Sequence, residues 1–302
     1  MSVVHKATLD NGLTVLLKEM HHAPVASFMI WYRVGSRHER PGLSGASHWV
    51  EHMLFKGTPR FPGNLLERQI SREGGYWNAF TWLDFTAYFE TMPAHKIDLC
   101  LQLEADRMVN AEMSETAVEL ERTVILSERQ MCENDPRFLL NEALTAAAFQ
   151  VHPYRHDTIG EEADLRSMTR GDLYDHYRRY YVPNNAIAVA VGDFDHHSIL
   201  ARIEQLFGEI PAGETGHTEY FDRRSPSSVE LAPLAAASLN SHQEPPQRDE
   251  RRVTIEGPGD AAYFTAAYRV PGATHPDYFP LVLLNAAFAG GSSLGLFGGG
   301  GS

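Results

Sequence analysis

The stretch GASHWVEHMLFKGT, residues 45–58, decides which fold and which chemistry can be expected of this chain. Ser44 can cap a helix that continues to about Phe55, because a serine side chain accepts a hydrogen bond from the first N–H groups of a helix. The following residues, KGTP at 56–59, place a glycine and then a proline where a helix typically stops. We therefore expect one helix here, bounded at both ends.

Within this helix, His48, Glu51 and His52 form an H-x-x-E-H pattern. Residues four apart lie on one helical face, so His48 and His52 can present imidazole nitrogens to one cation at about 2.0 to 2.1 Å. The Glu51 carboxylate reaches the same side and can handle a metal-bound water without being a ligand. The pattern alone leaves an alternative open, in which both histidines are surface residues or hydrogen-bonded core residues.

A second helix, expected from Ser114 to about Asn134, can supply a third ligand. A catalytic zinc site normally has three protein ligands and leaves the fourth position to water, so two histidines do not complete it. Glu121 and Glu128 are seven residues apart and lie two turns along one face of this helix. Spacing alone does not choose between them and the other acids of the helix, which are just as easily a solvated face: Glu115, Glu119 and Glu133.

Strand-like and helix-like segments surround these two helices without strict βαβ alternation. The expected strands are 7–9, 14–18, 25–33, 76–81, 85–92 and 186–191. The other expected helices, with apolar residues at three- and four-residue spacing, are 64–73, 94–110, 137–149, 170–181 and 196–207. We predict an α+β fold, a mostly antiparallel sheet with helices packed on one face.

Composition divides the chain into three parts. Residues 1–211 form the expected N-terminal domain, and residues 212–251 are a linker rich in Pro, Ser, Gly and charge. Residues 252–302 are the start of a second, apparently truncated domain, with expected strands at 252–255 and 263–270 and a helix at 278–289. About 50 residues are too few for a domain matching the first.

Charge and hydropathy exclude several classes of protein. The 302 residues hold 26 Lys+Arg against 39 Asp+Glu, a net charge of −13, so nucleic acid is not an expected partner. No apolar run approaches the roughly 18 residues that span a bilayer, and the N-terminus lacks the pattern of a secretory signal. Cys100 and Cys132 are expected to be reduced thiols rather than a disulfide framework. We expect no membrane contact and a cytoplasmic location.

Three blocks occur in one order along the chain: GASHWVEHMLFKGT, then GGYWNAFTWLDFTAYF at 74–89, then LERTVILSERQ at 120–130. Together they resemble the pitrilysin or insulinase family of inverted-motif zinc peptidases, especially its mitochondrial-processing-peptidase-like bacterial members. The resemblance implies the processing-peptidase-like domain fold and one zinc per chain. It implies that Glu128 is the third zinc ligand beside His48 and His52, and that Glu121 supports the site.

The resemblance further implies a zinc endopeptidase that hydrolyses peptides or unfolded segments, in which Glu51 takes the proton of the attacking water. The strand at 76–81 would pair with the substrate backbone, with Asn78 and Ala79 as the closest contacts. In the alternative reading of this strand, Trp77, Phe80 and Trp82 are core aromatics and Asn78 is a turn residue.

A non-catalytic peptide-binding or partner subunit remains the second functional class, since this family contains such subunits. The full-length protein is expected to work as a homodimer or as a heterodimer with a related chain.

Overall fold

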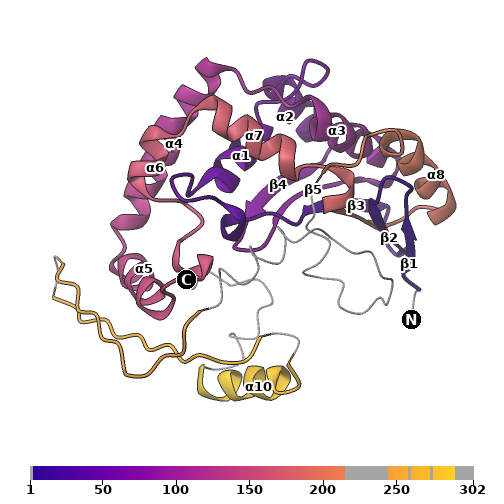
Figure 1. Cartoon of the computed structure of the whole chain (residues 1–302). Helices are drawn as coiled ribbons and strands as arrows, with labels where there is room; N and C mark the ends of the chain where they lie inside the picture. The colour runs from indigo at the N-terminus through magenta and orange to yellow at the C-terminus, as the bar shows by residue number, and fades with distance from the viewer. Residues whose placement is uncertain (1–2, 215–243, 258–259, 273–274, 290–302) are drawn as a thin grey trace. The chain divides into compact units, whose positions relative to one another are not determined.

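The computed structural model describes residues 3–214, 244–257, 260–272 and 275–289, and a single six-stranded sheet organises it (Figure 1). The strands are β1 (His5–Thr8), β2 (Thr14–Glu19), β3 (Val25–Tyr32), β4 (Tyr76–Thr81), β5 (Thr86–Pro93) and β6 (Ala186–Gly192). Their order across the sheet is β1-β2-β6-β3-β5-β4. Only the β2–β6 pair of this sheet is parallel, and the other four pairs are antiparallel. The predicted mostly antiparallel sheet is therefore confirmed.

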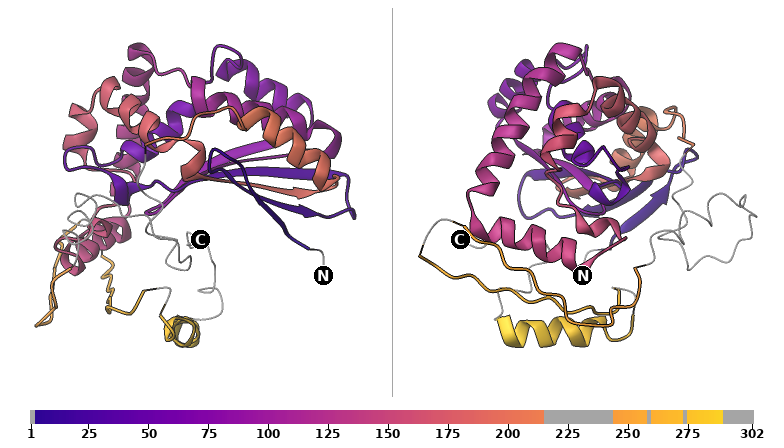
Figure 2. Two further views of the ribbon diagram at one scale, coloured as in Figure 1. Left: turned by 45° about the vertical axis from the view of Figure 1, so that its right-hand side comes forward. Right: turned by 60° about the vertical axis from the view of Figure 1, so that its left-hand side comes forward.

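Most of the helices lie on one face of this sheet, as the left view of Figure 2 shows, and α5 lies beyond the end of the sheet. The helices of this part of the chain are α1 (Ala46–Leu54), α2 (Gly63–Arg72), α3 (Ile97–Asn110), α4 (Glu115–Glu133), α5 (Pro136–Ala148), α6 (Glu162–Ser167), α7 (Arg170–Tyr180) and α8 (His196–Phe207). Short 3-10 turns are η1 (Ser36–His38), η2 (Ala94–Lys96), η3 (Pro153–Arg155) and η4 (Pro183–Asn185). Helices α1, α3 and α8 contact the strands directly, and α4 and α7 pack on α1.

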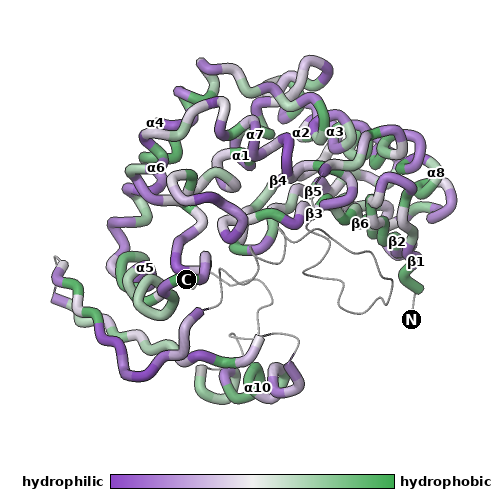
Figure 3. The backbone as a smooth tube through the Cα atoms, in the orientation of Figure 1, coloured by the Kyte–Doolittle hydropathy of each residue, from purple (hydrophilic) through white to green (hydrophobic). Residues whose placement is uncertain are grey.

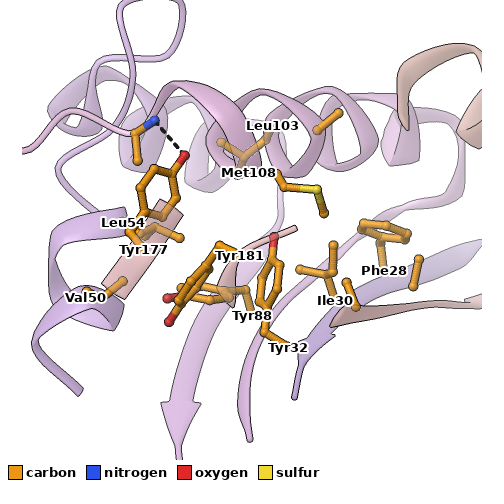
Figure 4. Packing of buried hydrophobic residues seen from close by; sticks show 14 of the residues in the cluster. Phe28, Ile30, Tyr32, Val50, Leu54, Tyr88, Leu103, Met108, Tyr177 and Tyr181 are labelled. Carbon is orange, nitrogen blue, oxygen red and sulfur yellow. Dashed lines mark hydrogen bonds between the residues drawn. The ribbon is translucent and has the colours of Figure 1, made fainter. Parts of the chain in front are cut away.

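The core lies between the sheet and these helices. Alternate residues of β3 are buried, Phe28, Ile30 and Tyr32 among them, as expected for a strand with one covered face. Figure 4 shows these side chains meeting Tyr88 of β5 and Met108 of α3. Hydrophobic residues gather on the sheet, most clearly near β2 and β6 (Figure 3). The apolar pattern of the strands thus fixes which face the helices cover.

Most of the predicted elements are confirmed to within a few residues, and two predictions fail. The expected strands at 252–255 and 263–270 form no strand in the described part of the chain. Strand-type residues favour a pleated surface only where a neighbouring strand and a packed face exist, and no paired neighbour occurs there among the described residues. The short helix α6 was not expected, because six residues carry too little periodicity.

The chain divides into two compact units, residues 1–257 and 258–302. The second contains α10 (Tyr278–Ala289), which agrees with the expected helix at 278–289. Most of the expected linker, residues 215–243, lies outside the described residues, so the predicted domain boundaries stay a prediction. Cys100 and Cys132 are free thiols. Among the described residues, none of the helices combines the length and apolar character that crossing a membrane requires.

Candidate metal centre

Helix α1 is positioned by a carboxylate rather than by the expected serine cap. Its N-cap is Gly45, with a positive φ of 89°, and the Glu39 carboxylate accepts hydrogen bonds from the N–H groups of Gly45 (2.8 Å) and Ser47 (2.7 Å). Ser44 instead donates to Asp164 at 2.6 Å. The Ser44 prediction is therefore wrong. Burial raises the pKa of Glu39 to about 8, so this carboxyl group satisfies the free N–H groups of the helix by hydrogen bonding rather than by a negative charge, and it comes from a preceding turn.

The structure brings His48, His52 and Glu128 together, with α4 lying beside α1 (Figure 1). The Nε2 atoms of the two histidines are 3.2 Å apart. Glu128 places Oε1 3.8 Å from His48 Nε2 and Oε2 3.7 Å from His52 Nε2. Tetrahedral zinc with bonds of 2.0–2.1 Å separates its ligand atoms by roughly 3.3 Å, so these three groups can surround one ion with small movements.

The protonation state of His48 also suits a cation. Burial and the neighbouring His52 lower the pKa of His48 to about 4, so its ring is neutral near pH 7. His48 Nδ1 is buried and has no hydrogen-bond partner among the described residues, so no such bond fixes its tautomer and Nε2 can offer a lone pair. Neutral imidazoles and a carboxylate are the forms that bind zinc.

Glu121 contacts the opposite edge of the His52 ring. Its Oε1 atom is 2.9 Å from His52 Nδ1, and its Oε2 atom forms an ion pair with Lys56 Nζ. Burial acts to raise the pKa of Glu121, but the contacts with Lys56 and His52 outweigh it and lower the pKa. A carboxylate at Nδ1 favours the tautomer with Nδ1 protonated, which leaves the Nε2 lone pair directed toward the ligand position. This geometry agrees with the expected supporting role.

Glu51 lies in α1, between His48 and His52 in sequence, and its side chain is buried. It is not a member of the group formed by His48, His52 and Glu128. Thr81 Oγ1 of β4 donates a hydrogen bond to Glu51 Oε2 at 2.5 Å. Burial raises the pKa of Glu51, and the Thr81 hydrogen bond opposes that rise. A raised pKa brings a carboxylate nearer to the range of a general base at neutral pH. Sequence reasoning missed Thr81, because nothing in the sequence relates it to a helix 30 residues earlier.

Strand β4 lies at the end of the strand order and so presents a free edge among the described strands. Asn78 is exposed within the strand, so the reading as a turn residue is wrong. Trp77 packs edge-on against Phe55 with ring centroids 4.7 Å apart, whereas Trp82 is 49% exposed and not a core residue. Side chains alternate along a strand, so Ala79 shares the face of Trp77 and Thr81, toward α1.

The other acids of α4 have different partners. Glu119 forms an ion pair with Arg122 and Glu133 one with Arg129, at 2.7 and 2.9 Å. Glu115 is exposed in the first turn. Of the five acids, the folded chain therefore brings Glu128 to the ligand atoms and Glu121 behind them.

Comparison with known proteins shows which family this chain resembles. The pattern of the family described as insulinase (peptidase family M16) matches residues 14–162, and that of the M16 inactive domain matches residues 167–297. Mitochondrial-processing peptidase subunit beta of Lentinula edodes is 29% identical over 282 residues, which cover 93% of this chain and 57% of that protein. An uncharacterized zinc protease of Mycobacterium leprae is 30% identical over 294 residues, 97% of this chain and 62% of the relative.

The crystal structure of a protease from Helicobacter pylori shares the fold with a TM-score of 0.68 at 30% identity, covering 70% of this chain and 51% of that chain. This chain thus spans between half and two thirds of the length of these relatives. The two matched regions together extend over nearly the whole sequence, with the zinc-type motif in the first. The chain belongs to the insulinase family of peptidases, family M16.

Proposed function

We propose that this chain contributes the catalytic centre of a zinc endopeptidase that hydrolyses peptide bonds in peptides or unfolded protein segments. The observation that carries the proposal is that His48, His52 and Glu128 each place one possible ligand atom, a ring nitrogen or a carboxylate oxygen, within 4.8 Å of the other two. Relatives named as zinc proteases support zinc as the ion. Because the chain spans only part of its relatives' length, the activity of the whole protein belongs to the proposal.

Each residue has a separate task in the proposed reaction. His48, His52 and Glu128 hold the ion, and Glu121 orients the His52 ring. When bound, zinc acts as a Lewis acid, which lowers the pKa of a water molecule and polarises the scissile carbonyl. Glu51 accepts the proton of the attacking water and delivers it to the leaving amine nitrogen. The Thr81 hydroxyl holds one oxygen of Glu51 in place during both transfers.

The free edge of β4 supports an extended peptide as substrate. A peptide that pairs with β4 makes main-chain hydrogen bonds whatever its sequence, and its side chains point alternately toward and away from α1. Asn78 and Ala79 are the proposed contacts. The Asn78 Oδ1 atom already accepts the Ala79 N–H at 2.9 Å, so peptide pairing at this position exchanges one hydrogen bond for another.

A non-catalytic subunit is the second candidate. It is favoured by the match of residues 167–297 to the M16 inactive domain and by a relative from Bos taurus that is named as cytochrome b-c1 complex subunit 1 rather than as a peptidase. A homodimer or heterodimer, and a cytoplasmic location, stay predictions. The presence of both a ligand set and the buried Glu51 favours the enzyme, because a binding subunit has no physical need for the two together.

The first experiment is the zinc content per chain after excess metal is removed. We expect one zinc in the parent and much less in Glu128→Gln, because the amide is a poorer ligand than the carboxylate. Glu119→Gln, an exposed position on the same helix, is the matched control and should keep its zinc. A parent chain without zinc, or equal zinc in Glu128→Gln, would contradict the proposed centre.

A further inference from the structure

Helix α4 offers two carboxylates to the histidine pair, and they are chemically identical. Glu121 and Glu128 are seven residues apart, which is about 10 Å along the helix. One approaches Nδ1 of His52 and the other approaches Nε2. Both side chains are long enough to take several rotamers, so something beyond residue type must keep each carboxylate in its place.

Lys56 pairs with only one of these two carboxylates, that of Glu121. Each oxygen of Glu121 has its own partner, because Oε1 meets His52 Nδ1 at 2.9 Å and Oε2 forms the ion pair with Lys56 Nζ. The Glu121 side chain is 8% exposed, so little water can replace either contact. Glu128, at 35% side-chain exposure, has its oxygens 3.7 and 3.8 Å from the two Nε2 atoms.

The backbone of Lys56 is held where this contact requires it. Lys56 lies just beyond the C-cap residue of α1, Phe55, and four residues after His52, about one turn further along. Its N–H donates to the Met53 carbonyl at 3.0 Å, and its own carbonyl accepts the Gly63 N–H at 3.1 Å. The lysine is therefore anchored on both sides of its Cα before its side chain reaches Glu121.

We infer that Lys56 is a positioning residue of the metal centre: it fixes Glu121 on the back of the His52 ring, which directs Nε2 of His52 to the metal and reserves Glu128 as the ligand. Without Lys56, Oε2 of a buried carboxylate loses its partner, and the carboxylate gains by rotating away from His52. The inference rests on the zinc site proposed above.

The test is zinc affinity, measured by competition with a chelator on the full chain. We expect Lys56→Met to bind zinc about tenfold more weakly, the lower end of the range for outer-shell partners. Lys56→Arg, which keeps the charge, should restore most of the affinity. Lys96→Met is the matched control, because Lys96 pairs with Glu73 at 2.8 Å and is 40% exposed against 38% for Lys56. Its affinity should equal that of the parent.

A double-mutant cycle separates this role from a general loss of structure. If Lys56 acts through Glu121, then Lys56→Met should cost no further affinity in a Glu121→Gln chain. A loss that adds fully to that of Glu121→Gln, or an unchanged affinity in Lys56→Met, would overturn the role of Lys56. Should Lys56→Met unfold, Lys56→Gln takes its place in the cycle. A parent that binds no zinc would overturn the proposed function itself, which makes the two failures distinguishable.

Discussion

Two buried glutamates near the histidine pair, Glu51 and Glu121, have different hydrogen-bond partners, and their pKa values are shifted in opposite directions. Glu51 accepts a hydrogen bond from the neutral Thr81 hydroxyl, and burial raises its pKa. Glu121 meets the Lys56 ammonium and the His52 ring, which lower its pKa in spite of burial. A carboxylate of raised pKa suits proton transfer, whereas one of lowered pKa stays ionised and suits a fixed support. The surroundings thus suit the two glutamates to the two different roles proposed for them.

Replacing Glu51 tests the first assignment. We expect Glu51→Gln to keep one zinc per chain, because it lies outside the ligand set, and to lose peptidase turnover by about 10²–10⁴-fold, the usual contribution of a general base. Turnover is measured on an unfolded protein substrate with the parent as reference. Full turnover in Glu51→Gln would assign the base elsewhere.

At the scale of helices, α1 is held from three directions. Glu39 satisfies its first N–H groups, and Arg122 of α4 stacks over Trp49 with its guanidinium carbon 4.8 Å from the ring centroid. From α7, His176 Nε2 lies 3.1 Å from the Ser47 hydroxyl. These contacts set the position of α1 against its neighbours more narrowly than apolar packing alone.

The contact between α7 and α1 predicts a pH dependence of stability. Burial, followed by the nearby positive groups His38, Arg179 and Arg40, lowers the pKa of His176 to about 3. Between about pH 6.5 and pH 3 His176 is therefore protonated in the unfolded chain and neutral in the folded chain. The contribution to stability is fully present above pH 6.5 and falls as the pH drops toward 3.

We expect His176→Gln to reduce this acid sensitivity, because glutamine can still meet Ser47 but takes up no proton. The measurement is the midpoint of thermal unfolding at pH 7 and at pH 5, for parent and variant. The midpoint temperature should fall further between pH 7 and pH 5 in the parent than in His176→Gln. An identical loss in both chains would mean that His176 is protonated in the folded state or that other groups dominate.

How far the sequence predicts this site differs between its parts. The helix that carries Glu128 follows from local periodicity, and the helix that carries His48 from the glycine and proline that follow it, although its expected serine cap was wrong. The His pair follows from a spacing of four. The choice of Glu128 depended on the family resemblance, because five acids of α4 satisfy the same local rule. Thr81, Lys56 and Glu39 escaped the sequence reasoning, since their roles arise from contacts that only the tertiary fold creates.

At the scale of the whole molecule, one buried charge cluster joins the sheet to the helix layer. Arg107 of α3 donates to Glu104 at 2.9 Å and to Glu90 of β5 at 3.1 Å, and all three side chains are at most 1% exposed. The Arg107 guanidinium also lies over the Tyr88 ring at 4.4 Å. Burial and the neighbouring Glu104 raise the pKa of Glu90 well above its usual range.

Removing Arg107 should be costly. We expect Arg107→Met to lower the free energy of unfolding by about 3–5 kcal/mol, because it removes one partner of a buried ion-pair cluster and leaves the hydrogen bonds of Glu90 and Glu104 unmade. Urea unfolding of the full chain measures this. Arg137→Met, which removes an exposed pair with Asp135, is the control and should change stability by no more than about 0.5 kcal/mol. A small effect of Arg107→Met would mean that the core does not depend on this positive charge.

The position of β6 has a consequence for how the chain is made. Strands β2 and β3 follow one another in sequence, but β6 lies between them, pairing Thr14 with Ile187 on one side and Ala26 with Gly192 on the other. During synthesis β2 and β3 leave the ribosome before β6, so the edge of each strand that later pairs with β6 is unpaired until then, and such edges favour association with other chains. The sheet on which α1 rests can close only after Gly192 has emerged. Contacts so distant in sequence make for slow folding, so the nascent chain has a long interval in which chaperones can protect it.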